Sequence, residues 1–290
     1  MTPDPNLIKE LHDLFAYMDD EVQEVSIRQP KHKLEGETAA DSRELGVLSL
    51  TEGDVESALK HFRRGIDQRT ESDPQGYEDL AGAFEYADME AEAVTEYNRA
   101  LEMGGSPEAR AALSSLARRY GRFSEAIRQL EEAVRIEPEV PFLHFKLAET
   151  LREAGMPTRA YAAARRATEL DPKQPLYYYW IGDLLIAMGR FDEALSFLRT
   201  AVELSPGDDY LLLRTAVAFW GAGMQIEAIR AVRLAAELDP SKALYHGLVQ
   251  VLLETNGQAE DAAAEQEKAS KMDPYDRDFL ARILAEMKLG

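Results

Sequence analysis

The sequence predicts an all-α fold of stacked helical hairpins, because three landmarks recur in one register along the second half of the chain. A proline follows an acidic or polar residue every 34 residues, at Pro138, Pro172, Pro206, Pro240 and Pro274. When this proline is counted as position 32, each period also has glycine at position 15 and alanine at positions 20 and 27. A constant period of this length is typical of tandem repeats made of two helices.

Each landmark has a mechanical role in such a hairpin. The glycine allows the positive φ that the turn from the first helix (A) to the second helix (B) needs, at Gly121, Gly155, Gly189, Gly223 and Gly257. The two alanines lie on helix B and let neighbouring helices approach closely, as at Ala126 and Ala133. The proline cannot continue helix B, so it ends that helix and leads into the next helix A.

Two weaker copies of the unit precede the regular ones. The first begins near Ala39 and keeps its landmarks at Gly46, Gly53, Ala58 and Phe62. The second begins near Pro74 and keeps them at Tyr77, Leu80, Ala81, Phe84, Ala93, Tyr97 and Ala100. Three substitutions mark these copies as degenerate, since Gly65 replaces an alanine, Asp88 the turn glycine and Gly105 the terminal proline.

The whole pattern resembles the tetratricopeptide repeat (TPR) family, whose period is 34 residues. The resemblance implies a right-handed α-solenoid of about seven repeats over 39–276, at 39–73, 74–106, 107–140, 141–174, 175–208, 209–242 and 243–276. Residues 1–38 are predicted to form an amphipathic helix at 5–18 and a linker. Residues 277–290, with Phe279, Ile283 and Met287 at helical spacing, are predicted to form a capping helix that covers the last repeat.

Composition excludes several classes of protein. The formal charge is −20 and the pI is near 4.7, which argues against nucleic-acid binding over a broad surface. The absence of cysteine excludes disulfides, thiolate metal sites and a cysteine nucleophile. The beginning of the chain lacks the charge pattern of a signal peptide, and no apolar stretch is long enough to span a bilayer. We expect a cytoplasmic protein, although a periplasmic location reached with a removed signal stays open.

The sequence offers little for catalysis. Its five histidines never pair at ligand-like spacing, and no phosphate-binding loop is present. Gly221 and Gly223 begin a dinucleotide-like pattern between two helices rather than after a strand, and Ser57 with Lys60 matches an acyl-enzyme pattern inside a helix B. Both matches are interpreted as coincidences of helical sequence. We expect no enzyme activity, no cofactor, no metal and no small-molecule substrate.

A stripe on the A helices is the best candidate for function. The resemblance to TPR proteins implies that the A helices line a concave groove. Positions 4, 7, 8 and 11 of each A helix are expected to pack within the array. The remaining face at positions 2, 5, 6, 9, 12 and 13 is therefore predicted to form the groove. It comprises Arg118, Arg119, Phe142, Phe145, Lys146, Glu149, Arg152, Leu176, Tyr179, Trp180, Asp183, Tyr210, Leu213, Arg214, Val217 and Trp220, and continues with Leu244, Leu248 and Val251.

This stripe collects both tryptophans of the chain, other aromatic residues and several cations. Aromatic residues and arginine are the usual anchors of protein interfaces, so the stripe predicts a groove that binds a peptide or helix of a partner protein. The alternative is that some of these rings pack inside the solenoid. The leading hypothesis is a non-catalytic adaptor that serves complex assembly. Its rival is a self-assembling scaffold in which the helix at 5–18 enters the groove of another copy.

Overall fold

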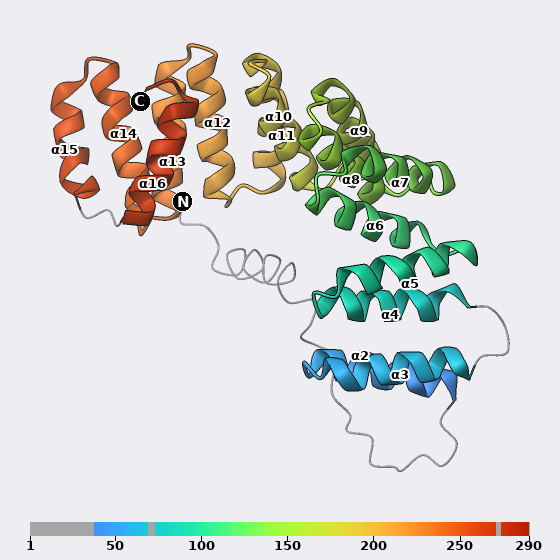
Figure 1. Cartoon of the computed structure of the whole chain (residues 1–290). Coiled ribbons are helices and arrows are strands. Elements are labelled where there is room, and N and C mark those ends of the chain that lie inside the picture. Colours follow the sequence, from blue (N-terminus) through green and yellow to red (C-terminus); the bar gives the residue numbers. More distant parts are fainter. Residues whose placement is uncertain (1–37, 69–72, 271–273, 290) are drawn as a thin grey trace. The chain divides into compact units, whose positions relative to one another are not determined.

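The computed structural model describes residues 38–68, 73–270 and 274–289, and every regular element in these ranges is an α-helix. Figure 1 shows that successive helices run back and forth as hairpins. The all-α architecture predicted from the repeat is therefore confirmed. The number of repeats and their boundaries stay predictions, and the amphipathic helix expected at 5–18 lies outside the described residues.

The chain forms two compact units, which divide after Met156. The described helices of the N-terminal unit are α2 (Ala39–Thr51), α3 (Val55–Asp67), α4 (Pro74–Tyr86), α5 (Glu90–Glu102), α6 (Pro107–Arg119), α7 (Phe123–Ile136) and α8 (Pro141–Glu153). Those of the C-terminal unit are α9 (Pro157–Leu170), α10 (Pro175–Ala187), α11 (Phe191–Leu204), α12 (Asp209–Gly221), α13 (Gln225–Leu238), α14 (Ala243–Thr255), α15 (Ala259–Ala269) and α16 (Pro274–Glu286). Each unit is described by itself.

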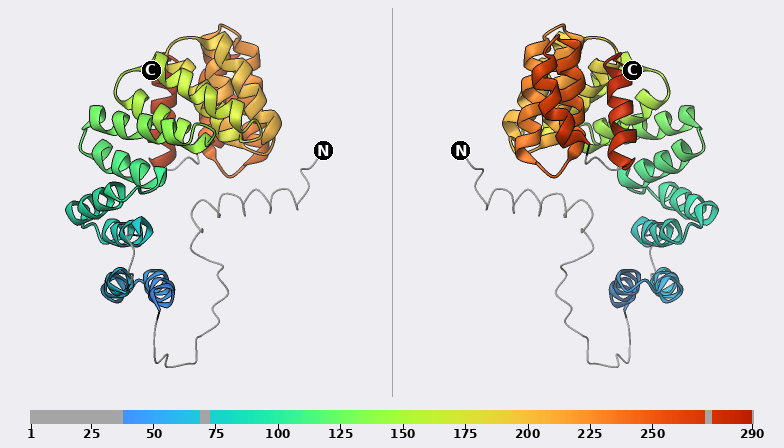
Figure 2. Two further views of the ribbon diagram at one scale, coloured as in Figure 1. Left: turned by 90° about the vertical axis from the view of Figure 1, so that its right-hand side faces the viewer. Right: turned by 90° about the vertical axis from the view of Figure 1, so that its left-hand side faces the viewer.

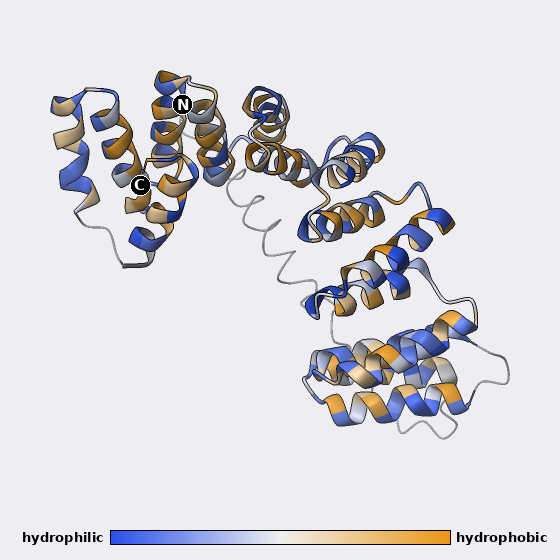
Figure 3. Ribbon diagram, turned by 45° about the horizontal axis from the view of Figure 1, so that its top comes forward, coloured by the Kyte–Doolittle hydropathy of each residue, from blue (hydrophilic) through white to orange (hydrophobic). Residues whose placement is uncertain are grey.

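Within each unit the hairpins form by the packing of consecutive helices. Helices α2, α4 and α6 pack most closely against α3, α5 and α7, and α10, α12 and α14 pack most closely against α11, α13 and α15. Hydrophobic residues, orange in Figure 3, alternate with hydrophilic ones around these helices. This pattern gives each helix an apolar side for its neighbours and a polar side for water.

The turns between helices A and B have the predicted backbone. The glycine has a φ of +77° at Gly53, +69° at Gly121 and +72° at Gly189. The residue after it donates its N–H to the carbonyl five residues earlier, as Arg122 does to Ala117 at 2.9 Å, which closes the end of helix A. Asp88 takes the same conformation with a φ of +56°, so the repeat imposes this turn even where glycine is missing.

The alanines of helix B are fully buried in the regular hairpins up to α13, as predicted. Ala126 and Ala133 in α7, like Ala194 and Ala201 in α11, have no exposed surface. The prolines also act as expected, because α7 ends at Ile136, two residues before Pro138. Any larger side chain at the alanine positions would hold the helices further apart.

The C-terminal helix departs from the prediction. It begins on Pro274 itself rather than at 277, and it ends at Glu286. Its main packing partner is α14, whereas the A helices α12 and α14 each also pack against the helix B before them, α11 and α13. Both views of Figure 2 show α16, in dark red, offset from the α14–α15 hairpin. Helix α16 thus lies against the A helices instead of extending the regular stack.

Tight packing at Gly182 predicts a loss of stability on substitution. A β-carbon at this position of α10 would lie 2.6 Å from Leu198 Cγ, so Gly182→Ala should lower the free energy of unfolding by about 1–3 kcal/mol. The matched control is Gly82→Ala in α4, where the nearest atom is the Tyr97 hydroxyl at 3.9 Å. That variant should be neutral or more stable by about 0.5–1 kcal/mol. Urea unfolding followed by circular dichroism measures both, and equal effects would contradict the packing.

Candidate functional site

The C-terminal unit brings predicted groove residues together in one cluster. We call it the aromatic–ionic cluster. Three helices contribute to it, each with one aromatic and one charged side chain: Tyr179 and Asp183 from α10, Tyr210 and Arg214 from α12, Phe279 and Glu286 from α16. The pairs on α10 and α12 are four residues apart, and the pair on α16 is seven residues apart, so each pair shares one helix face.

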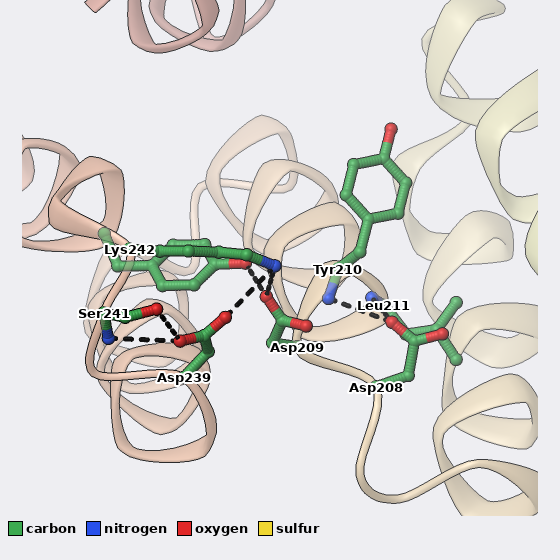
Figure 4. A network of polar contacts seen from close by, with 8 residues as sticks. Asp208, Asp209, Tyr210, Leu211, Asp239, Ser241 and Lys242 are labelled. Atoms are coloured by element: carbon green, nitrogen blue, oxygen red, sulfur yellow. Dashed lines mark hydrogen bonds and ion pairs between the residues drawn. The ribbon is translucent and has the colours of Figure 1, made fainter. Parts of the chain in front are cut away.

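The beginning of α12 sets the direction of Tyr210. Asp208 caps the helix, and its Oδ1 accepts from the N–H groups of Tyr210 at 3.0 Å and Leu211 at 3.1 Å. Burial raises the pKa of Asp208, although the hydrogen bonds from the backbone oppose that effect. Figure 4 shows the Tyr210 ring pointing away from these carboxylates. The ring lies on the side of α12 where Phe279 of α16 stacks on it.

A separate polar network ties the beginning of α12 to the beginning of α14. Asp209 Oδ2 accepts a hydrogen bond from Lys242 Nζ at 2.7 Å and another from the Tyr245 hydroxyl. Lys242 also pairs with Asp239 at 3.5 Å (Figure 4). These contacts join consecutive repeats. They pair Asp209 and Asp239 with Lys242 inside the chain, so we interpret the network as structural.

Arg214 is the charged centre of the aromatic–ionic cluster. Only 6% of its side chain is exposed, and it donates from Nη2 to Asp183 at 2.6 Å and from Nη1 to Glu286 at 2.5 Å. Burial alone lowers the pKa of this guanidinium, but Asp183 and Glu286 outweigh burial and raise it. Its Nε–H has no acceptor among the described residues. Both acceptors of this guanidinium are therefore carboxylates of its own chain, one on α10 and one on α16.

An aromatic layer lies beside this ionic pair. The Tyr210 ring meets Tyr179 edge-on with centroids 5.8 Å apart, and it stacks on Phe279 at 6.5 Å with an interplanar angle of 14°. Burial, and then the charge of Asp183, raises the pKa of the Tyr179 hydroxyl far above its usual value. Tyr179 is therefore a neutral donor at physiological pH, and the layer offers an apolar surface with polar edges.

Several predicted groove residues are buried instead of facing a groove. The exposed fraction is 5% for Trp180, 6% for Phe145, 0% for Leu213 and 2% for Val217. Arg214, expected to meet a partner's acid, instead meets two acids of its own chain. The expectation of an open face was wrong for these residues, because an A helix inside a stack contacts a neighbour on either side as well as its own helix B. More than four positions of each A helix are then buried. Leu244 and Leu248 are buried for the same reason.

The predicted residues of the N-terminal unit lie on α6 and α8 and, apart from the buried Phe145, are more accessible. Phe142 is 47% exposed, and Lys146 Nζ lies 5.4 Å from the centre of the Phe142 ring. Lys146 also pairs with Glu149 at 3.0 Å. Arg152 is exposed on the same helix. We call these four residues of α8 the Phe142 surface.

The arginines of α6 already have acidic partners. Arg118 pairs with Glu153 at 2.5 Å, and Arg119 bridges Glu85 at 2.9 Å and Glu90 at 2.6 Å. All these pairs are partly exposed to solvent, and exposed pairs of this kind contribute about 0–1 kcal/mol each. They can exchange one carboxylate for another with little loss, so a partner's acid can replace an internal one.

Sequence reasoning missed Phe279 and Glu286 as site residues. Phe279 was assigned only to the apolar face of a capping helix. The signal that could have revealed them is their spacing of seven residues, two helical turns on one face. Their partners on α12 are more than 60 residues away in the chain, and such a contact follows from the tertiary structure alone.

Helices α11, α12 and α13 line a concavity of about 530 Å³, with apolar residues such as Leu195, Phe219 and Leu234 and the cations Arg199 and Arg230 in its lining. Sequence reasoning assigned helix B only to packing and so did not consider this surface.

No group of three or more metal-ligating side chains occurs in the described ranges. Those ranges also hold no helix long and apolar enough to cross a membrane.

Stacked antiparallel helix hairpins with small residues at their contacts define a helical-repeat protein of the α-solenoid class. Three family models described as tetratricopeptide repeat match residues 107–150, 145–209 and 185–252. The chain belongs to the tetratricopeptide repeat family. No curated protein is significantly similar to it.

Solved structures share this fold. The C-terminal part of a TPR repeat-containing protein from Cytophaga hutchinsonii has a TM-score of 0.69 at 15% identity, over 80% of this chain and 95% of that one. YrrB, described as a TPR protein with an unusual peptide-binding site, has a TM-score of 0.55 at 23% identity, over 65% and 97%. MamA from Desulfovibrio magneticus RS-1 has a TM-score of 0.53 at 23% identity, over 57% and 94%. At these identities the likeness concerns the fold.

The contrast between Trp180 and Phe142 predicts a difference in stability. Trp180→Ala removes a side chain from a closed environment and should lower the free energy of unfolding by about 3–5 kcal/mol. Phe142→Ala should lower it by less than about 1 kcal/mol, because nearly half of that residue is already in water. Urea unfolding monitored by circular dichroism distinguishes the two. A small effect at Trp180 would mean that this ring is not part of the core.

Proposed function

We propose that this protein is a non-catalytic scaffold that binds a peptide segment or helix of a partner protein on the inner faces of its A helices, as an assembly factor or subunit of a multiprotein complex. One observation carries the proposal: Tyr210 and Arg214 of α12, backed by Tyr179 and Asp183 of α10, hold helix α16 by an aromatic stack and an ion pair. Contacts of this kind are typical of a helix lying in a protein groove.

The Phe142 surface supports the same function in the N-terminal unit. Its ring is exposed, and Lys146 beside the ring is held by a partly exposed ion pair with Glu149. A complementary segment carries an apolar side chain for the Phe142 ring and a carboxylate for Lys146 or Arg152. Buried aromatic anchors supply most of the affinity in such interfaces, while charges at the rim mainly set the association rate.

Family membership supports the proposal at a general level. YrrB is described as having a peptide-binding site, and this chain shares its fold over 65% of its length. The peptide-binding residues proposed for this chain are argued from its own contacts, because a binding site cannot be transferred from YrrB at 23% identity. Binding by the full-length chain in its own cells is therefore the decisive measurement.

Photo-crosslinking at the exposed aromatic tests the scaffold function. With a photoreactive phenylalanine in place of Phe142 in the full-length chain, irradiation in the cells that make the protein should give a covalent adduct with a specific partner. Phe142→Ala should weaken the affinity of the purified chain for that partner tenfold or more, since anchor residues carry energies of that size.

The control is the same photoreactive residue in place of Tyr86, which ends α4 in the same unit and is 62% exposed. Adducts that form equally at both positions reflect exposure alone. That result, or the absence of any partner adduct at position 142, would remove the Phe142 surface as a binding site.

A further inference from the structure

Helix α16 covers A helices of its own unit in a way that the repeat does not require. A capping helix that continues the array lies on the preceding helix B, as α12 lies on α11 and α14 on α13. Helix α16 instead packs on α14 and reaches across to Tyr210 and Arg214 of α12. Its position is that of a bound segment rather than of an eighth repeat.

The side of α16 that faces the unit is short and well defined. Ile283 is 1% exposed and Met287 is 5% exposed, and they provide the apolar contacts. Phe279 stacks on Tyr210, and Glu286 accepts from Arg214. These residues stand at i, i+4, i+7 and i+8, which places them on one face of the helix. Asp278 is exposed on another side of the helix, and the exposed Arg282 lies over the Phe279 ring at 5.3 Å.

The receiving surface is built for the charge of Glu286. Arg214 is almost completely buried, yet it uses one arm of its guanidinium for Asp183 and offers the other to α16. Without an acid in that place, a buried cation would keep a single acceptor, and its Nε–H already lacks one among the described side chains. Burial of an incompletely paired charge is unfavourable, so this surface selects a segment that brings a carboxylate.

The contacts of α16 are also replaceable. Glu286 is 44% exposed in its ion pair and Tyr210 is 37% exposed in its stack, so neither contact is sealed from solvent. The connection between α15 and α16 is short, which gives α16 a high effective concentration at this surface. A partner helix that makes the same contacts displaces α16 only if it makes additional contacts, or if the contacts of α16 with α12 are weakened.

From these observations we infer that the face formed by Tyr179, Asp183, Tyr210 and Arg214 is a docking site for an amphipathic helix of a partner protein, and that α16 is its exchangeable internal occupant. The partner helix carries an aromatic residue for Tyr210 and, seven residues later, a carboxylate for Arg214. This inference rests on the proposed scaffold function and names one class of ligand for it.

A peptide with the sequence of residues 274–289 tests the inference on the full-length chain. In the variant Phe279→Ala with Glu286→Gln, the weakened α16 should leave the site open. The labelled peptide should then bind this variant at least tenfold more tightly than it binds the unmodified chain, as measured by fluorescence anisotropy. A peptide that itself carries Phe279→Ala and Glu286→Gln should lose that binding.

The matched control is Asp278→Asn, which neutralises an acid on the exposed side of α16 and should leave peptide binding as weak as in the unmodified chain. Adding Arg214→Gln, or the milder Arg214→Lys, to the weakened chain should reduce peptide affinity at least tenfold. Circular dichroism verifies that each variant is folded.

Three results would overturn the inference. The first is equal peptide affinity of the unmodified and weakened chains when both are folded, and the second is binding that survives loss of Arg214. The third is a dimer of the unmodified chain, seen by light scattering, that the weakening of α16 abolishes, because the occupant is then α16 of a second copy. Crosslinking at position 142 concerns the other unit, so failure there is distinguishable from failure here.

Discussion

Close approach of helices at small residues is the constraint from which the other features follow. Alanines such as Ala194 and Ala228 have no exposed surface, and they hold each hairpin at a fixed distance from the next. That distance places side chains of successive A helices within reach of one another. Tyr179 can meet Tyr210 at 5.8 Å, and Asp183 can reach Arg214, only because α10 and α12 lie side by side in the stack. The aromatic–ionic cluster is thus a product of the repeat spacing.

Local features of the fold were predictable from the sequence because they depend on a few neighbouring residues. The turn at Gly121 needs a positive φ, and the end of α7 needs only Pro138. Asp88 shows the limit of this reasoning, since its turn is set by the helices on either side rather than by its own preference. The helix after Pro274 was predictable as a helix, but its place was not, because its contacts with α12 have no counterpart elsewhere in the period.

The candidate site was predicted in part for a similar reason. Helical periodicity correctly grouped Tyr179 and Asp183 with Tyr210 and Arg214. It could not distinguish the exposed side of an A helix from the side that neighbouring helices cover. Trp180, predicted to be exposed, is buried by those neighbours. Nor did composition show that an arginine such as Arg119 is held by acids from another helix. Burial and pairing depend on the stack, which the residue pattern describes only in outline.

Net charge and local charge act in opposite directions at the aromatic–ionic cluster. The chain carries 53 acidic against 33 basic residues, so its long-range field repels an acidic helix. Affinity for such a helix must therefore come from short-range contacts with Arg214 and Tyr210, and not from steering. Salt screens the repulsion over about 8–10 Å at physiological ionic strength, while the nearly buried Arg214 is screened much less. Added salt should thus speed the encounter with an acidic segment more than it weakens the bound state. An internal helix such as α16, delivered by the chain itself, does not meet that barrier, which explains how a strongly acidic protein can keep an acid on its inner face.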